Sequence, residues 1–292
     1  DLIEKYDRIA AVNLYLRNSW YHQAMKQFID EGEIGELAIL RICHMTPGLA
    51  PGENGILQGY FQLIGLPFSC CDVLAAAITF NKFTCNQYLK GFGVKVSESI
   101  VLRAGQTVSD EEVASTIGFP CFVKPNVGGS SFGVTKVKSV DQVQSAIAKA
   151  FEEGDEVMIE AFMSGTEITC GMYKTKEKTV VLPITEVVPE NEFFDFDAKY
   201  KGQVQEITPA RISEALTARV QKLTAAIYDI LGCKGIVRID YIISEGDVIN
   251  LLEVNTTPGM TATSFIPQQV RAAGLDIKDV MTDIIENELV KS

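Results

Sequence analysis

Two carboxylates and one amide oxygen are spaced so that they could share a metal ion. Glu253 and Asn255 stand two residues apart at the end of an apolar stretch. Alternate residues of a β-strand project from the same face, so their side chains should point the same way. Asp240 closes a second strand-like segment, 235–241, and residues 245–247 between the two segments predict a hairpin turn.

Two antiparallel strands joined by this turn would bring Asp240, Glu253 and Asn255 together, with Arg238 on the face of Asp240. Three hard oxygen ligands without histidine or cysteine favour Mg²⁺, which also accepts water and substrate phosphates. The alternative is a solvated acidic face. The flanking residues are too apolar for an exposed sheet, so we favour the metal site.

A second candidate site combines a lysine with a glycine-rich loop. Lys124 lies in the short apolar strand 121–125, where a charged side chain needs an anionic partner. The loop 128–133 follows, with Ser130 and Ser131 inside it, and a strand rather than a helix comes next, which excludes a Walker A loop. A plain hairpin turn is the alternative, but together with Lys124 the loop predicts phosphate binding through backbone N–H groups.

Two further stretches could complete a nucleotide site. The apolar strand 157–163 carries Glu160, and Glu167 follows it, which suits an adenine slot with a carboxylate for the ribose hydroxyls. The loop 193–200 holds three phenylalanines and Tyr200. It is either an exposed aromatic patch or a lid that excludes water from a reactive intermediate.

Composition limits the function classes. The chain has 292 residues, 47% of them hydrophobic, and a net charge of −12. These values argue against a nucleic-acid partner, and no apolar run is long enough to cross a membrane. The seven cysteines have no paired spacing, so we expect reduced thiols in a cytoplasmic protein. His22 and His44 have no metal-ligand spacing and are interpreted as structural.

Periodicity predicts alternating helices and strands. Strands are expected at 8–16, 36–43, 100–103, 121–125, 134–137, 157–163, 168–173, 179–188, 235–241 and from 249, and helices at 19–31, 56–63, 73–78, 83–92, 110–117, 140–151, 213–231 and 276–289.

These motifs resemble the D-alanine–D-alanine ligases of the ATP-grasp fold over residues 52–292. The resemblance rests, in family order, on Gly52-Glu53-Asn54-Gly55 with Gln58-Gly59, Lys124-Pro125 with the loop 128–133, Glu160 with Glu167, Lys199-Tyr200, Arg238-Ile239-Asp240, and the run 253–261 extended to Ser264. It implies an α/β fold of α+β lobes, in which ATP lies between two antiparallel sheets. The expected lobes are 1–81, whose first 52 residues are atypical for the family, then 82–167 and 168–292.

The resemblance implies a role for each matching residue. For ATP these are Lys82, Lys124, Ser130, Ser131, Glu160, Ala161, Phe162, Met163, Glu167, Lys199 and Asn255. Two Mg²⁺ ions, which Mn²⁺ could replace, would be held by Asp240, Glu253 and Asn255. Glu53, Lys199 and Ser264 would bind substrate, and the catalytic group would comprise Arg238, Ser130, Tyr200 and the Gly259 N–H.

The implied reaction joins two D-alanine molecules through a D-alanyl phosphate, releasing ADP and phosphate, for peptidoglycan synthesis. Mg²⁺ and lysines would neutralise the crowded phosphates, and Arg238 would stabilise the oxyanion. Tyr200, where ester-forming relatives tend to carry histidine, favours a dipeptide product. We expect a homodimer that acts on small molecules, without a nucleic-acid or membrane partner.

The first 52 residues depart from that family. The Gly-Gly-x-Ser-x-Glu loop for the first D-alanine is absent, and Gly48 stands where the family has histidine. Residues 13–48 instead resemble a fragment of the glucose-fructose-type NAD-dependent oxidoreductases, without their dinucleotide fingerprint, in a small βαβ-like lobe. The alternatives are therefore another ATP-grasp carboxylate–amine ligase, or an ATP-binding chain with impaired ligation.

Overall fold

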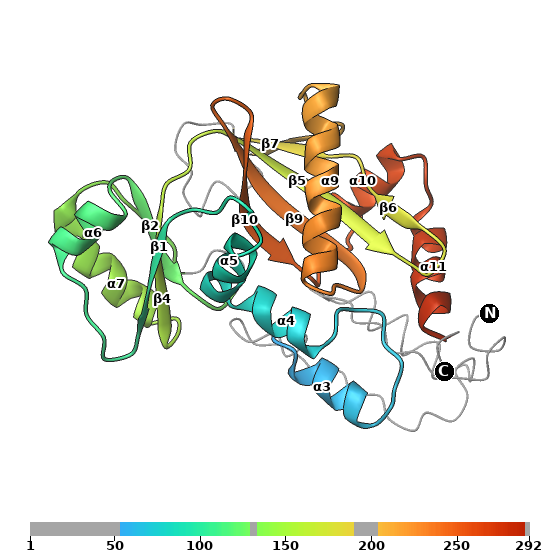
Figure 1. Ribbon diagram of the computed structural model, residues 1–292, viewed down its shortest axis with the longest axis horizontal. Helices are drawn as coiled ribbons and strands as arrows, with labels where there is room; N and C mark the ends of the chain where they lie inside the picture. The colour runs from blue at the N-terminus through green and yellow to red at the C-terminus, as the bar shows by residue number, and fades with distance from the viewer. Residues whose placement is uncertain (1–52, 129–132, 190–203, 290–292) are drawn as a thin grey trace.

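The structure is a computed structural model that describes residues 53–128, 133–189 and 204–289. Its described residues form two antiparallel sheets, of four and six strands. The smaller sheet, with helices α6 and α7, lies at one end of the long axis, and the larger sheet, with α9, α10 and α11, lies at the other (Figure 1). The elements expected at 8–16, 19–31 and 36–43 lie outside the described residues.

The small sheet has the strand order β1-β4-β2-β3. Its strands are β1 (Ser99–Arg103), β2 (Cys121–Pro125), β3 (Thr135–Val137) and β4 (Glu156–Ala161), and it is covered by α6 (Asp110–Thr116), a 3₁₀ turn (Val140–Gln142) and α7 (Val143–Phe151). Val113, Val123, Val143 and Ile159 are fully buried in the core between helices and sheet. The alternation of apolar and polar residues along β2 therefore turns Lys124 away from this core.

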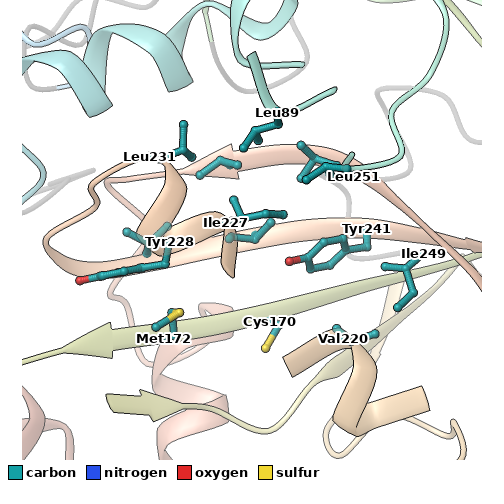
Figure 2. Packing of buried hydrophobic residues seen from close by; sticks show 14 of the residues in the cluster. Leu89, Cys170, Met172, Val220, Ile227, Tyr228, Leu231, Tyr241, Ile249 and Leu251 are labelled. Atoms are coloured by element: carbon teal, nitrogen blue, oxygen red, sulfur yellow. The ribbon is translucent and has the colours of Figure 1, made fainter. Parts of the chain in front are cut away.

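The large sheet has the order β10-β9-β5-β7-β8, and β6 pairs with β5. Its strands are β5 (Thr166–Lys174), β6 (Thr179–Val181), β7 (Thr185–Pro189), β8 (Val204–Ile207), β9 (Gly235–Ser244) and β10 (Val248–Asn255). Helix α9 (Glu214–Ile230) packs Val220 and Ile227 on one face, against Cys170, Tyr241 and their neighbours (Figure 2). Helices α10 (Phe265–Ala272) and α11 (Ile277–Leu289) cover part of the other face.

Three helices precede the small sheet: α3 (Ile56–Leu63), α4 (Val73–Phe80) and α5 (Lys82–Lys90). Ala75 from α4 and Cys85 and Leu89 from α5 join the main core of the large sheet. Asn81 is the N-cap residue of helix α5, and its side chain accepts a hydrogen bond from the Thr84 N–H at 2.9 Å. The sequence had placed Lys82 before this helix. That was wrong, because the Asn81 cap makes Lys82 its first residue.

The prediction of one strand at 179–188 was also wrong. The chain forms two short strands, β6 and β7, with Leu182, Pro183 and Ile184 between them. Pro183 has no N–H to continue a ladder. Strand β8 and helix α10 were not predicted, because β8 is short and polar and α10 contains Pro267, which is tolerated in a first turn. The other elements predicted within the described residues are present, with shifted ends.

Six cysteines lie in the described part of the chain, and all six are free thiols there. Of the helices that the structure describes, none is long and apolar enough to cross a membrane.

Glu156 joins α5 to the small sheet. Its Oε2 accepts hydrogen bonds from Asn126 Nδ2 at 2.7 Å and from Asn81 Nδ2 at 3.0 Å, and its Oε1 accepts one from Arg103 Nε at 2.9 Å. Asn126 in turn accepts the Phe83 N–H at 2.8 Å through its side chain. These bonds, led by that from Asn126, lower the pKa of Glu156. The folded state therefore favours the ionised form of the Glu156 carboxylate.

We expect Glu156→Gln to lower the free energy of unfolding at pH 7 by about 2 kcal/mol, as is typical when hydrogen bonds to a charged group are lost. A lowered folded-state pKa gives stability that is present above the ordinary value of 4.5 and is lost as the pH falls through the lowered pKa. The difference between parent and variant should therefore shrink below pH 4.5. Urea unfolding at several pH values measures it, with exposed Glu245→Gln as the control. A difference independent of pH would contradict the assignment.

Candidate functional site

The charged face of the large sheet is built by the pairing of β9 with β10. Asp240 lies directly opposite Glu253, and Arg238 lies directly opposite Asn255. Directly opposed residues of antiparallel strands share a face, so the four side chains project together. The predicted convergence of Asp240, Glu253 and Asn255 is thus present in the strand register.

A β-bulge makes this register possible. The pairing shifts by one residue between Leu251 and Glu253, which leaves Leu252 as the extra residue of β10. Before the bulge, Ile249 and Leu251 face the core under α9, and after it Val254 does. Without the extra residue, Glu253 would follow the alternation of Leu251 into that core. The bulge therefore places Glu253 and Asn255 beside Arg238 and Asp240.

Arg238 and Asp240 form a charged pair. The Nε of Arg238 donates to Asp240 Oδ1 at 2.9 Å, and its NH2 group donates to Oδ2 at 2.7 Å. The same guanidinium lies 3.6 Å from Glu253 and 5.3 Å from the centre of the Phe265 ring. Burial alone would lower the pKa of Arg238, but the carboxylates of Asp240, Glu253 and Glu167 together outweigh burial, so the pKa is raised. Arg238 is a permanent, oriented positive charge.

Thr169 on β5 supports this pair from the neighbouring strand. Its hydroxyl donates to Asp240 Oδ1 at 2.5 Å, and it lies opposite Asp240 in the pairing of β5 with β9. Asp240 is buried, whereas Glu253 is more accessible. Sequence reasoning missed Thr169, because its only signal is a polar residue inside an otherwise apolar strand.

The donor set fits Mg²⁺ in its chemistry: two carboxylates and the Asn255 amide oxygen, which also accepts the Thr257 N–H at 3.0 Å. Among the described residues, no three His, Cys, Asp or Glu side chains gather as a metal cluster by themselves. A metal ion here would therefore need Asn255 and oxygens from a bound ligand, as Mg²⁺ sites that bind phosphate typically do.

Two lysines face the same region from α5 and the small sheet. Lys124 Nζ lies 2.5 Å from the buried Glu160 carboxylate across the pairing of β2 and β4, and Lys82 Nζ donates to the Gly128 carbonyl at 2.6 Å. Burial lowers the pKa of Lys82, and the Glu253 carboxylate opposes that shift. Glu253 of the large sheet therefore lies close enough to Lys82 of α5 to affect its pKa, so the two side chains border one site.

Glu53 faces the same region from the turn before α3. Burial raises its pKa, Lys82 lies close enough to oppose that rise, and Glu253 adds to it. A carboxylate whose pKa is raised by burial and by a second carboxylate would be stabilised in its charged form by a positively charged ligand group.

The end of β4 offers ring surfaces to a ligand. Phe162 lies 5.9 Å from the Phe122 ring, and Lys136 Nζ lies 4.0 Å above Phe162. The N–H groups of Ala161 and Phe162 are already bonded to the carbonyls of Glu98 and Pro120. These two N–H groups are therefore already used, and a ligand here would contact the side chains of Ala161 and Phe162, with Met163 next along the chain. Glu167 on β5 lies on the sheet face that carries Thr169.

The turn after β10 brings Gly259 against Ser264. The Ser264 hydroxyl lies 2.8 Å from the Thr261 hydroxyl, and its N–H donates to the Thr261 carbonyl at 2.8 Å. A Cβ at Gly259 would lie 2.8 Å from Ser264 Oγ, so a larger residue would displace the serine. Ser264 occupies the N-cap position of α10 without a side-chain capping bond, and the next residue, Phe265, lies against Arg238. Ser130, Ser131, Lys199 and Tyr200 lie outside the described residues, as do His22 and His44.

Comparison with known proteins decides the family. A family model described as D-ala D-ala ligase C-terminus matches residues 88–286. The chain belongs to the D-alanine–D-alanine ligase family. It is 73% identical over 253 residues to the D-alanine–D-alanine ligase of Bacteroides fragilis, covering 87% of this chain and 78% of that protein. It is 70% identical over 256 residues to that of Phocaeicola vulgatus, covering 88% and 79%.

Solved structures of this ligase family agree with the fold. A D-alanine–D-alanine ligase from Bacillus anthracis superposes with a TM-score of 0.76 at 28% identity, covering 97% of this chain and 98% of that one. The VanG D-Ala:D-Ser ligase from Enterococcus faecalis superposes with a TM-score of 0.72 at 32% identity, covering 81% and 69%. The ATP-grasp fold expected from the sequence is thereby confirmed.

We expect the Lys124–Glu160 pair to behave as a buried ion pair. Removing one partner, by Lys124→Met or Glu160→Gln, should lower the free energy of unfolding by about 3–5 kcal/mol, because the other charge is left without compensation. The double variant Lys124→Met/Glu160→Met should recover most of that loss. Urea unfolding of all three variants measures this.

The exposed pair Lys90–Glu98, 2.8 Å long, is the control, and Lys90→Met should change stability by less than about 1 kcal/mol. Equal losses at both pairs, or a double variant as unstable as the sum of the two single ones, would contradict the assignment.

Proposed function

We propose that this chain joins two D-alanine molecules with ATP, forming D-alanyl-D-alanine, ADP and phosphate for peptidoglycan synthesis. The observation that carries the proposal is the shared sheet face of Arg238, Asp240, Glu253 and Asn255. Lys82, on helix α5, lies close enough to Glu253 for that carboxylate to affect its pKa. The family membership of the chain supports it, as does the name that its relatives share, D-alanine–D-alanine ligase.

The nucleotide would bind between the two sheets. Lys82 and Lys124 would contact phosphates, because they are cations held near acids of both sheets. Ser130 and Ser131 would close over the phosphates, and Lys199 would contact them from the loop that it shares with Tyr200. The base would rest on the segment Ala161, Phe162 and Met163 beside Glu160, and Glu167 would accept the ribose hydroxyls. A relative from Bacillus anthracis solved in complex with ATP superposes with a TM-score of 0.69 at 30% identity.

Asp240, Glu253 and Asn255 would hold two Mg²⁺ ions, or Mn²⁺ in their place. When bound, these ions would neutralise the phosphate charge and orient the phosphate that is transferred. The other contacts with the ligand would come from protein side chains. Arg238 already bridges Asp240 and Glu253, so it can shift its contacts toward a ligand oxygen without leaving the site.

The carboxylate of the first D-alanine would attack the terminal phosphate of ATP and displace ADP, giving a D-alanyl phosphate. The amine of the second D-alanine would then attack the acyl carbon, and phosphate would leave. Arg238 and the Gly259 N–H would stabilise the oxyanion between these steps. Ser264 would hold the second D-alanine, Glu53 would attract the ammonium of a substrate, and the segment with Ser130, Lys199 and Tyr200 would exclude water.

The three lobes would then be 1–81, 82–167 and 168–292, with the site between the last two, and the family resemblance supports a cytoplasmic homodimer. Release of ADP and phosphate that depends on D-alanine, together with the dipeptide identified by mass, tests the proposal. ATP binding without release would favour a binding module, and release with a different amine acceptor would favour another carboxylate–amine ligase.

Glu253→Gln removes one charge from the proposed metal ligands. We expect turnover to fall by at least about a hundredfold while the unfolding curve stays near that of the parent, because Glu253 is partly exposed and lies at the end of its strand. The concentration of Mg²⁺ that gives half-maximal rate should rise. Glu245→Gln, in the exposed hairpin turn, is the control. A variant within a few-fold of the parent at all Mg²⁺ concentrations would refute the role.

The first D-alanine should bind weakly. Residues 1–52 lack the family motif for this substrate, and losing a charge-assisted hydrogen bond costs about 1.5–3 kcal/mol, or about ten- to a hundredfold in affinity. We expect an ATP affinity typical of the family but a raised KM for the first D-alanine, and exchanging residues 1–52 for a family N-terminus should restore it. Titration of D-alanine decides it: saturation at the family's usual concentration would show that another group binds this substrate.

A further inference from the structure

Strand β5 has a gap in its hydrogen-bond ladder on the edge that faces away from β9, the strand that carries Arg238 and Asp240. β5 pairs with β7 at residues 167–169 and with β6 at residues 172–174. Between these pairings the neighbouring chain passes through Leu182, Pro183 and Ile184, and of these Leu182 donates its N–H to the Gly171 carbonyl at 2.8 Å. Leu182 supplies only a donor to Gly171, so the Gly171 N–H, which is buried in the sheet, needs another acceptor.

The side-chain amide of Gln269 fills this gap. Its Oε1 accepts the Gly171 N–H at 2.9 Å, and its Nε2 donates to the Thr169 carbonyl at 3.0 Å and to the Thr185 hydroxyl at 3.2 Å. Gln269 is fully buried on α10. Its oxygen thus replaces the carbonyl that a continuous neighbouring strand would have offered to Gly171, and its nitrogen links Thr169 of β5 to Thr185 of β7.

The gap lies across β5 from the two residues that carry the proposed chemistry. Thr169 pairs with Asp240, and Gly171 pairs with Arg238. Thr169 also donates its hydroxyl to Asp240. Gln269 therefore fixes the backbone that orients both members of the Arg238–Asp240 pair.

The same contact holds α10 against the sheet. A Cβ on Gly171 would lie 2.4 Å from Ile266 Cδ1 and 2.7 Å from Gln269 Oε1, so the helix approaches β5 as closely as glycine permits. Phe265, one turn before Gln269, lies against Arg238, and Ser264 precedes it. The position of Gln269 thereby sets the position of the residues at the start of α10.

We propose that Gln269 is a positioning residue for the amine-accepting side of the site. It fixes Ser264 and Phe265 on α10 relative to Arg238 and Asp240 on β9, through β5. This inference rests on the proposed ligase function. It assigns no contact between Gln269 and substrate. The larger effect is expected on the acceptor side, where α10 carries Ser264 and Phe265, because Gln269 reaches the nucleotide side only indirectly, through Thr169 and Asp240.

Gln269→Met keeps the length of the side chain and removes its hydrogen bonds. We expect it to raise the KM for the second D-alanine about tenfold and to lower turnover, because Ser264 and Arg238 lose their mutual register, while the KM for ATP stays within about twofold of the parent. Gln221→Met is the matched control, since Gln221 donates to the Leu182 carbonyl from α9. It should change neither constant. Parallel changes in both constants, or a loss of thermal stability alone, would overturn the proposal.

Gln269→Glu provides a rescue with a pH signature. A protonated carboxyl group can accept from Gly171 and donate to Thr169, as the amide does, whereas an ionised one cannot donate. The acceptor KM of this variant, divided by that of the parent at the same pH, should be near one at low pH and rise as the carboxyl ionises. A ratio independent of pH would overturn the proposal.

Amide hydrogen exchange without substrates separates this inference from the ligase function. Gln269→Met should speed exchange at Gly171 and along α10 but not in the small sheet. If the parent chain forms no dipeptide, the ligase function fails, and the exchange measurement still decides the positioning: unchanged protection at Gly171 and α10 would refute it.

Discussion

One extra residue in β10 determines where the chemistry can occur. Leu252 shifts the pairing of β10 with β9, so that the apolar residues before it and the polar residues after it use opposite faces of the same sheet. Glu253 and Asn255 thereby reach Arg238 and Asp240, while Leu251 and Val254 still contribute to the core under α9. The bulge lets one strand serve as core and as ligand-binding surface within eight residues.

The charges of the site are arranged as interlocking pairs across two sheets. Arg238 bridges Asp240 and Glu253 on the large sheet, Lys124 meets Glu160 on the small one, and Lys82 lies between them. Buried charges are stable only when they are compensated. The site therefore compensates its lysines and arginine with its own carboxylates and a carbonyl, and a polyanionic ligand can take over these contacts.

The sequence predicted the parts of the site that depend on local spacing. The even spacing of Glu253 and Asn255 and the short turn at 245–247 were enough to predict that Asp240, Glu253 and Asn255 converge on one face. The apolar positions 249, 251 and 254 also contained the signal of the bulge, which was not used. Thr169 and Gln269 could not be found, because their roles depend on strands and helices that are distant in sequence. The roles of Ser130, Ser131, Lys199 and Tyr200 stay predictions.

Helix α5 is bonded to one sheet and packed on the other. Asn81 at its start is tied through Glu156 to the small sheet, whereas Cys85 and Leu89 pack into the core of the large one. This nine-residue helix lies between the two sheets, so its contacts with both of them help to set their separation (Figure 1). The width of the space between the sheets therefore depends on α5 and on the segment after it, where Val96 pairs with Leu251 of β10. Substitutions at Cys85 or Leu89 would alter which ligands fit between the sheets without changing a residue of the charged face.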